Sequence, residues 1–275
     1  MRYNLADLHV HTLCSDGLRT PTQAVEEARD AGLQALGLTD HDTVDGLVEA
    51  NEVGARLGIE IITGTELSAH IKEREVHILG YCFDWQDSDL IANLNQVHQH
   101  RYERGIAIVE RLNDLGVDVT IEEVLNQAKG SPLGRPHIAA AMVERGSVRS
   151  KDEAFNRYIG DRGPAFSPKP YTAAADVIDL IHRARGVAIL AHPGASMPES
   201  VVTQLVNGGL DGIEVFHPAH QPPQIEYYMQ LVSRFNLLMS GGSDSHGDAE
   251  GTRIGEYGIG YEAIEAMRKR AASFA

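Results

Sequence analysis

Short apolar runs alternate with helical patterns along most of this chain, and this alternation restricts the possible folds more than any other feature. Helical patterns separate most of the runs. Because strands connected through helical crossovers pair in parallel, the sequence predicts a mainly parallel α/β sheet, most simply closed into a barrel. Seven runs are typical of buried strands, and in chain order they contain DLHVH, QALGL, IEIITGTE, EVHILGY, GVAIL, LDGIEVF and LLMSGG.

The ends of the first helices carry recognisable signals. Thr20 before Pro21 predicts a helix that begins at the proline, and Gly32 follows the predicted end of that helix. Gly58 is expected to end the next helix in the same way. The third and fourth strands are close enough in sequence to be joined through a hairpin at IKERE.

Residues 87–169 interrupt the strand and helix alternation. This stretch has helical patterns and no convincing strand pattern, and GPAFSPKPY, which contains three prolines, is expected to be its return linker. The predicted organisation is a TIM-like (β/α)7 barrel formed by residues 1–86 and 170–275, with a helical insertion, or cap, formed by residues 87–169.

The charge balance limits the possible partners. Thirty-nine acidic and 24 basic residues give a formal net charge of -15. A nucleic-acid duplex is not expected as a partner, because such binding needs a broad basic surface, whereas a small phosphorylated ligand needs only a few local cations. The sequence has no apolar run of membrane-spanning length, no signal-peptide pattern, and two cysteines, too few for a disulfide framework. We therefore expect a cytoplasmic protein without membrane association.

Residue types that ligate metals lie at or near the expected C-terminal end of every strand. In a parallel barrel these ends share one face, where such folds place their active sites. Clustered imidazoles and carboxylates would be costly to desolvate and would repel one another unless cations lay between them. A mixed set of nitrogen and oxygen ligands suits Mn²⁺, Zn²⁺ or Fe²⁺. The residues concerned are His9, His11, Asp40, His41, Glu66, His77, His192, His217, Asp244 and His246.

The motifs DLHVHTLCSDG, LTDHD, TGTE, the single His77, LAHPG and SDSH resemble, in this order, the motifs of the PHP (polymerase and histidinol phosphatase) family. The resemblance covers nearly the whole chain except the helical insertion. It implies a distorted barrel of seven strands with a site for two or three metal ions at its mouth. The insertion, which contains GSPLGRPHIA, resembles the branch that includes 3′,5′-nucleoside bisphosphate phosphatases and short-RNA 5′-exonucleases.

The resemblance also implies which residues hold the metals, with Mn²⁺ expected first and Zn²⁺ or Fe²⁺ as alternatives. Asp40 would either ligate the third metal or orient His41 or a water molecule. Asp7 is expected to hold the second nitrogen of a ligating imidazole. The implied ligands are His9, His11, Glu66 and Asp244 for the first metal, Glu66, His77 and His192 for the second, and Asp16, His41 and His246 for the third.

Such a site supports hydrolysis of a phosphate ester. Three divalent ions would outweigh the carboxylates and leave a locally cationic pocket, and a hydroxide shared between two metals could attack phosphorus in line. His192, His217 or a metal-bound water could protonate the leaving group, and the sequence does not choose among them. Asp40 completes the set of catalytic candidates.

GSPLGRPHIA is the basic tip of the insertion, and two interpretations of it remain open. It is either an ordinary turn and helix, with Pro136 in the first helical position and Arg135 solvated, or a second phosphate site. In the second interpretation, which we favour, Arg135 and His137 lie over the barrel mouth and clamp a phosphate. Lys169 on the return linker is a weaker candidate of the same kind.

The leading hypothesis is a metal-dependent phosphomonoesterase that acts on a small nucleotide, with the 3′-phosphate of nucleoside 3′,5′-bisphosphates as the favoured target. Two alternative enzymes are a 5′-to-3′ exoribonuclease on short RNA and a histidinol-phosphate-type phosphatase. A non-enzymatic alternative is a metal-stabilised accessory or binding module. That alternative predicts missing ligands, whereas every motif position is filled here.

Overall fold

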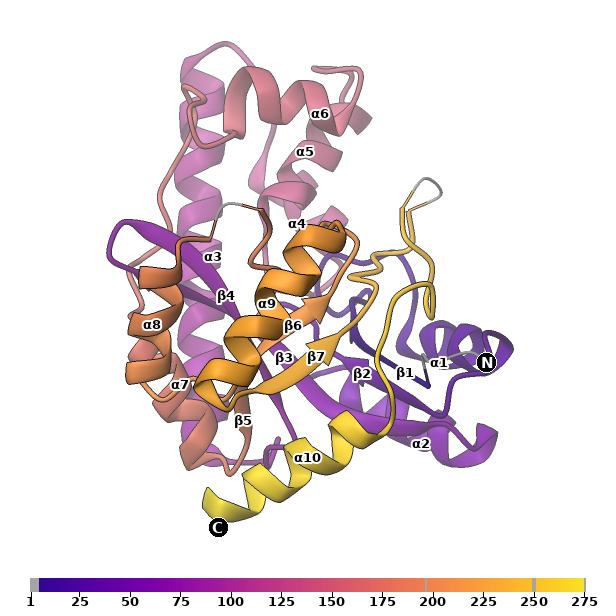
Figure 1. Ribbon diagram of the computed structural model, residues 1–275. Coiled ribbons are helices and arrows are strands. Elements are labelled where there is room, and N and C mark those ends of the chain that lie inside the picture. Colours follow the sequence, from indigo (N-terminus) through magenta and orange to yellow (C-terminus); the bar gives the residue numbers. More distant parts are fainter. Residues whose placement is uncertain (1–4, 196, 249–250, 275) are drawn as a thin grey trace. The chain divides into compact units, whose positions relative to one another are not determined.

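The predicted strands form one sheet whose strand order follows the chain (Figure 1). The computed structural model describes residues 5–195, 197–248 and 251–274. Within these ranges the strands are β1 Ala6–Val10, β2 Ala35–Leu38, β3 Glu60–Ile71, β4 Arg74–Tyr81, β5 Val187–Leu190, β6 Gly212–Phe216 and β7 Leu238–Gly241. The prediction of a mainly parallel α/β sheet is confirmed for β1–β2–β3 and for β5–β6–β7.

The fourth strand departs from the parallel prediction. β4 pairs antiparallel with both β3 and β5. The hairpin expected at IKERE is confirmed: Ile71 pairs with Arg74, and Lys72 takes a positive φ of 55° in the two-residue turn between them. A turn this short can only join antiparallel strands, so β4 begins at the edge of the sheet where β3 ends.

The two edge strands of the sheet approach each other without forming a ladder in the part of the chain that is described. A single parallel bridge joins Val10 to Ser245, and the His11 N–H donates to the Ser245 carbonyl at 3.1 Å. The sheet is therefore seven-stranded and mostly parallel, whereas the predicted barrel closure is reduced to this one bridge.

Six helices accompany the sheet in the described residues: α1 Pro21–Asp30, α2 Leu47–Leu57, α7 Ala174–Arg183, α8 Glu199–Asn207, α9 Pro222–Phe235 and α10 Glu262–Ala271, followed by a 3-10 turn at Ala272–Phe274. The predicted start of α1 is confirmed, because the Thr20 side chain accepts a hydrogen bond from the Gln23 N–H. Gly58 ends α2 with a φ of 73°, also as predicted.

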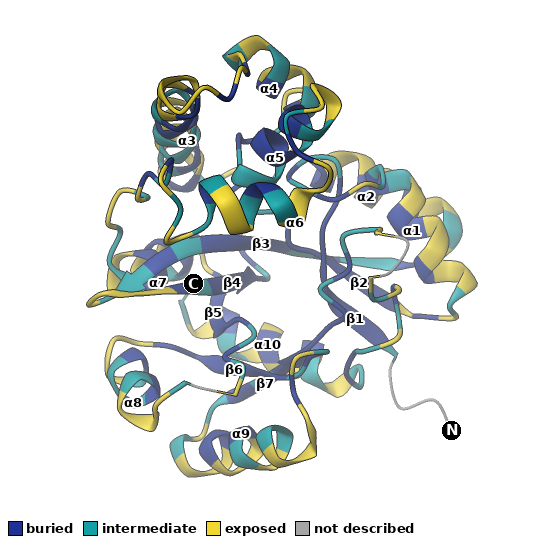
Figure 2. Ribbon diagram, turned by 90° about the horizontal axis from the view of Figure 1, so that it is seen from above, coloured by how far each residue is buried: buried dark blue, intermediate teal, exposed yellow. Residues whose placement is uncertain are grey.

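Both faces of the sheet are buried, as is usual for parallel strands. On one side Leu36 and Leu38 pack with residues of α1 and α2, among them Val25 and Leu47. On the other side Leu8 and Ile189 join a second apolar cluster that includes residues of α10. Figure 2 shows the strands as mainly buried, with exposed residues on the outer faces of the surrounding helices. Polar side chains within these strands are therefore exceptions that need partners.

The chain divides into two compact units, Met1–Ala92 with Tyr171–Ala275 and Asn93–Pro170. The insertion predicted from sequence covers residues 87–169, all of which are described and none of which lies in a strand. The second unit has an apolar cluster of its own. Among the described residues, no helix combines the length and apolar character needed to cross a membrane. The helices of this region are α3 Ser88–Asp114, α4 Ile121–Ala128, α5 Arg135–Glu144, α6 Lys151–Ala154 and a π-helical turn at Phe155–Ile159.

Candidate metal centre

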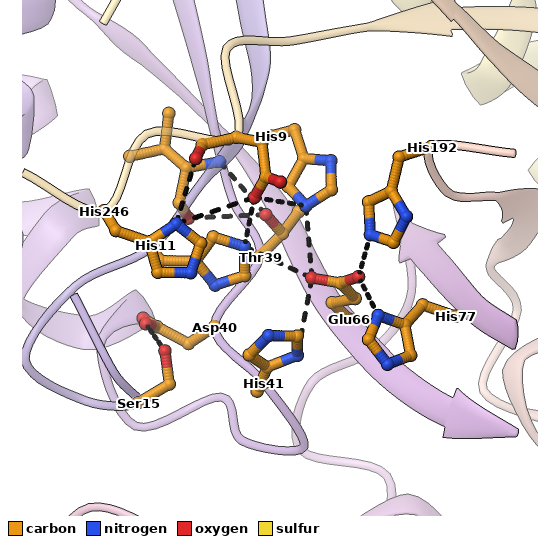
Figure 3. Close-up of polar contacts among 12 residues, drawn as sticks. His9, His11, Ser15, Thr39, Asp40, His41, Glu66, His77, His192 and His246 are labelled. Carbon is orange, nitrogen blue, oxygen red and sulfur yellow. Dashed lines mark hydrogen bonds and ion pairs between the residues drawn. The ribbon is translucent and has the colours of Figure 1, made fainter. Parts of the chain in front are cut away.

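Glu66 lies at the centre of a group of imidazoles (Figure 3). Its Oε2 is 3.1 Å from His9 Nε2 and 3.2 Å from His11 Nε2. Its Oε1 is 2.7 Å from His77 Nδ1 and 2.8 Å from His192 Nε2. Each carboxylate oxygen therefore has two ring nitrogens within 3.2 Å. Glu66 itself is fully buried. This is the geometry expected of a carboxylate that bridges two cations.

Two of these histidines also face Asp244. The Asp244 Oδ1 atom is 3.4 Å from His9 Nε2 and 3.1 Å from His11 Nε2. Together with Glu66, these side chains present one ligand atom each within 4.8 Å of one another. The structure thus brings together the four residues that the sequence assigns to a first metal.

A second group surrounds Asp16, which reaches the centre from the loop after β1. Asp16, His41 and His246, assigned from sequence to one metal, are joined there by His11, and their ligand atoms also lie within 4.8 Å of one another. The Asp16 Oδ1 atom is 3.4 Å from His246 Nε2 and 4.0 Å from His11 Nδ1. His11 therefore turns one ring nitrogen toward each group.

The third group contains His41, Glu66 and His77. His41 Nδ1 is 3.4 Å from Glu66 Oε2, so His41 is shared between this group and that of Asp16. Two expected strand positions are corrected here. Glu66 lies inside β3 and not near its end, and His77 lies in the middle of β4, because the hairpin reverses the strand direction at this edge.

Two of the clustered residues have backbone conformations that side chains rarely adopt. His192 after β5 has a φ of 23°, and Asp244 after β7 has a φ of 51°. Such conformations cost free energy and persist where surrounding contacts hold them. At His192 that contact is a hydrogen bond of 2.7 Å from its N–H to Glu214 Oε2.

Glu214 is a central residue of the site that the strand-end argument does not identify, because it lies inside β6. Its side chain is fully buried, and its Oε1 is 2.9 Å from His9 Nδ1. Burial opposes its ionisation, but the charge and hydrogen bond of His9 outweigh burial and lower the pKa of Glu214. The available sequence signal is a single acidic residue inside the otherwise apolar run GIEVF.

Asp7 does not hold an imidazole, so that expectation is wrong. Its buried carboxylate accepts hydrogen bonds from the backbone N–H groups of His9 at 3.3 Å, Ser243 at 2.9 Å and Gly255 at 2.8 Å. Residues two apart on a strand are separated by about 6.6 Å, too far for a short side chain to reach over its neighbour's ring. Glu214 supports the His9 ring instead, while Asp7 ties β1 to the segment after β7.

Asp40, expected to ligate the third metal or to orient His41 or a water molecule, contacts the loop after β1. Its Oδ1 accepts from the Thr12 N–H at 2.7 Å and from the Ser15 hydroxyl at 2.6 Å, and its Oδ2 accepts from the Thr12 hydroxyl at 2.7 Å. Among the described residues it belongs to none of the ligand groups. Both oxygens are engaged by the loop after β1, so Asp40 anchors the loop that carries Asp16.

His217 lies against the site from the end of β6. Its Nδ1 accepts a hydrogen bond from the Ala219 N–H at 3.1 Å, which leaves the proton of the neutral ring on Nε2. That nitrogen is 3.2 Å from Asp244 Oδ2, so it donates to the carboxylate. The side chain is only 8% exposed. These contacts orient Asp244.

The predicted phosphate-binding residues lie in the second unit, where Arg135 begins α5 and Pro136 is therefore the second helical residue, not the first. Arg135 Nη1 lies 2.7 Å from Asp161 Oδ1, and its guanidinium lies over the rings of Phe155 and Phe166. His137 Nδ1 accepts the Gly134 N–H at 3.1 Å, which caps the helix. Lys169 follows in the return linker. Arg135 has a partly exposed cationic head, which an anion would need.

Several buried polar atoms of the cluster are unsatisfied, as expected for atoms that bind divalent ions. Both ring nitrogens of His11, Asp16 Oδ1 and His41 Nδ1 are buried and lack a well-formed hydrogen bond to any described residue. Buried polar atoms are normally satisfied. Burial favours neutral His11, yet the nearby carboxylates of Asp244 and Glu66 outweigh it and raise the pKa of this residue to about 10. The carboxylates thus leave an excess of negative charge that cations would neutralise.

Comparison with known proteins agrees with this geometry. The PHP domain family matches residues 7–146. Phosphoribosyl 1,2-cyclic phosphate 1,2-diphosphodiesterase of Eggerthella lenta is 34% identical, with 88% of this chain and 94% of the relative aligned. The 5′-3′ exoribonuclease of Haemophilus influenzae is 33% identical, with 87% of this chain and 89% of the relative aligned. The 3′,5′-nucleoside bisphosphate phosphatase of Chromobacterium violaceum is 30% identical, with 90% of this chain and 89% of the relative aligned.

A solved structure supports the same relationship. A protein from Bifidobacterium adolescentis, assigned as a metal-dependent phosphoesterase, superimposes with a TM-score of 0.90 at 31% identity, over 96% of each chain. The relatives named above are all hydrolases of phosphate esters. The family expected from the motifs is therefore confirmed: this chain belongs to the PHP family and is a metal-dependent phosphoesterase.

Proposed function

We propose that this enzyme is a phosphomonoesterase that removes one phosphate from a small nucleotide, with the 3′-phosphate of nucleoside 3′,5′-bisphosphates as its preferred target. The observation that carries the proposal is the arrangement of Glu66, whose two oxygens each face two imidazoles within 3.2 Å. Such a centre suits a compact, doubly charged phosphate group. The 30% identity to a nucleoside bisphosphate phosphatase over most of both chains supports the substrate class.

We propose that the centre holds two or three divalent ions, with Mn²⁺ the preferred metal and Zn²⁺ or Fe²⁺ as alternatives. A divalent ion in such a site supplies positive charge for the phosphate oxygens and acidifies an attacking water molecule. The donors are imidazoles and carboxylates, and neither Cys14 nor Cys82 belongs to any of the ligand groups found among the described residues. The proposed ligands are His9, His11, Glu66 and Asp244, then Glu66, His77 and His192, then Asp16, His41 and His246.

His192, His217 and Asp40 have different proposed roles at this centre. His192 has a side chain that is 28% exposed, against 8% for His217, so we propose that His192 faces the leaving group. His217 then acts by orienting Asp244, and Asp40 acts by holding the loop of Asp16. We further propose that the sheet works as a distorted seven-stranded TIM-like barrel, with the Val10–Ser245 bridge as its closure and the inserted helices as its cap.

A second candidate function is 5′-to-3′ exonuclease activity on short RNA. It is favoured by the 33% identity to an exoribonuclease over most of both chains. The net charge of -15 favours short substrates over long ones, because long nucleic acids need an extended basic surface.

A screen with Mn²⁺ that measures both inorganic phosphate and mononucleotide products tests these candidates. The substrates are nucleoside 3′,5′-bisphosphates, mononucleotides, short 5′-phosphorylated RNAs and a phosphoribosyl cyclic phosphate. We expect the highest kcat/KM for the bisphosphates, with inorganic phosphate and the 5′-mononucleotide as products. Release of mononucleotides from RNA without turnover of bisphosphates would instead establish the second candidate, and preference for the cyclic ester would exclude both.

Arg135 provides a separate test of how a bisphosphate is recognised. We propose that Arg135, with His137 and Lys169, binds the phosphate that is not cleaved. Arg135→Ala should then lower kcat/KM for a bisphosphate about tenfold more than for a monophosphate, as expected for a partly exposed charge-assisted hydrogen bond. Arg157→Ala, which removes an exposed arginine of the same unit, is the matched control. Equal losses on both substrates would exclude this role for Arg135.

A further inference from the structure

The face of the β3–β4 hairpin that carries the metal centre continues outward beyond it. The register of this hairpin is unbroken: Ser68 pairs with His77, and His70 pairs with Glu75. Alternate residues of a strand lie on one face, so Glu66, Ser68 and His70 share a face with His77. Figure 3 shows Glu66 and His77 on this face, turned toward each other. His70 is the diagonal neighbour of His77, at about 7–8 Å.

An exposed aromatic ring covers His70. The rings of Tyr171 and His70 are stacked, with centroids 5.2 Å apart and planes 26° from parallel. The backbone holds this arrangement, because the His70 N–H donates to the Thr172 carbonyl at 2.7 Å and a parallel bridge pairs His70 with Ala173. Tyr171 is nevertheless 64% exposed, more than any other large apolar side chain described. Its ring therefore stacks on His70 and remains largely open to solvent.

A single exposed aromatic residue on a protein surface is ordinary and needs no function. Tyr171 differs in two respects. Its ring stacks on the ring of His70, which is paired through its backbone with the segment that follows Tyr171. His70 is also the diagonal neighbour of His77, a candidate metal ligand. Aromatic rings presented in this way bind nucleobases by stacking. In a nucleotide one ribose separates the base from the phosphate, so a phosphate at the metal centre would place its base in this neighbourhood.

We propose that Tyr171, supported by His70, is the stacking platform for the nucleobase of the substrate. The proposal rests on the proposed function, since it takes the substrate to be a nucleotide. It also separates the candidate substrates, because a phosphoribosyl ester without a base would gain nothing from the platform. Stacking is available to every base, so we expect similar kcat/KM values for different bases.

The test compares a nucleoside 3′,5′-bisphosphate with its abasic analogue, in which hydrogen replaces the base. Tyr171→Ala should lower kcat/KM for the nucleotide on the order of tenfold, mainly through KM, and leave turnover of the abasic compound unchanged. Tyr171→Phe is the matched control, because it keeps the ring and should retain wild-type values. Equal effects of Tyr171→Ala on both compounds, or none on the nucleotide, would overturn the platform.

Binding of the unreactive nucleoside, measured by calorimetry, gives a readout that does not require turnover. We expect weaker binding to the Tyr171→Ala and His70→Ala variants than to the wild-type enzyme. If the wild-type enzyme degrades short RNA and leaves nucleoside bisphosphates intact, but this difference in binding is found, the proposed function fails and the platform stands. If nucleotides are hydrolysed and the variants bind nucleoside as the wild type does, the platform fails and the proposed function stands.

Discussion

Asp244→Asn is expected to reduce phosphate release by roughly 10³-fold or more, because a metal ion contributes several kcal/mol of transition-state stabilisation and about 1.4 kcal/mol corresponds to a factor of ten. Asp244 Oδ1 lies within 3.4 Å of both His9 Nε2 and His11 Nε2, so it completes the group proposed for the first metal. Asparagine is nearly the same size but lacks the charge. It also tolerates the φ of 51° at this position, so the fold should be retained.

The measurements are the kcat of phosphate release and the amount of bound Mn²⁺ per protein, with circular dichroism as the check on folding. Asp248→Asn is the matched control, since Asp248 is an exposed carboxylate on the same loop and belongs to none of the ligand groups. It should behave as the wild type. A folded Asp244→Asn enzyme with unchanged turnover and unchanged metal content would show that the cluster is not the metal centre.

Glu214→Gln is expected to weaken metal binding by roughly 10–100-fold, the effect typical of removing a partner that supports a ligating imidazole. Glu214 Oε1 faces His9 Nδ1 at 2.9 Å, and its Oε2 accepts the His192 N–H at 2.7 Å. A carboxylate can accept both hydrogen bonds. An amide has one acceptor and one donor, so glutamine can satisfy only one of the two and turns its NH₂ group toward the other.

Because His9 and His192 are proposed ligands of different metals, this one substitution should weaken both sites. Titration with Mn²⁺ should therefore show two affinities reduced together, and kcat should recover at saturating metal. Glu226→Gln, which changes an exposed glutamate, is the control and should leave both affinities unaltered. Reduced thermal stability with unchanged metal affinities would show that Glu214 only supports the fold.

Much of this architecture is predictable from local sequence patterns. Thr20 with Pro21 starts α1, and Gly58 ends α2, because capping depends on a few neighbouring residues. The placement of His9, Asp244 and similar residues at strand ends also follows from the alternation of apolar runs and helical patterns along the chain. Parallel strands then bring these positions to one edge, and most of the expected ligands do meet there.

The antiparallel entry of β4 illustrates what local patterns leave open. An apolar run does not encode the direction of its pairing partner, and the short turn at Lys72 sets that direction only once both strands are in place. His77 reaches Glu66 for this reason, from the middle of its strand.

The sequence by itself determined the fold class, the helix ends and the residue types that gather at the metal centre, because these depend on periodicity and on neighbouring residues. Only the tertiary structure decided which acidic residue supports which ligand. Asp7 and Asp40 lie within two residues of a histidine in sequence but bind backbone groups and hydroxyls, whereas Glu214 reaches His9 from 205 residues away. Hydrogen bonds between buried side chains depend on distance and direction in space, and neither follows from separation along the chain.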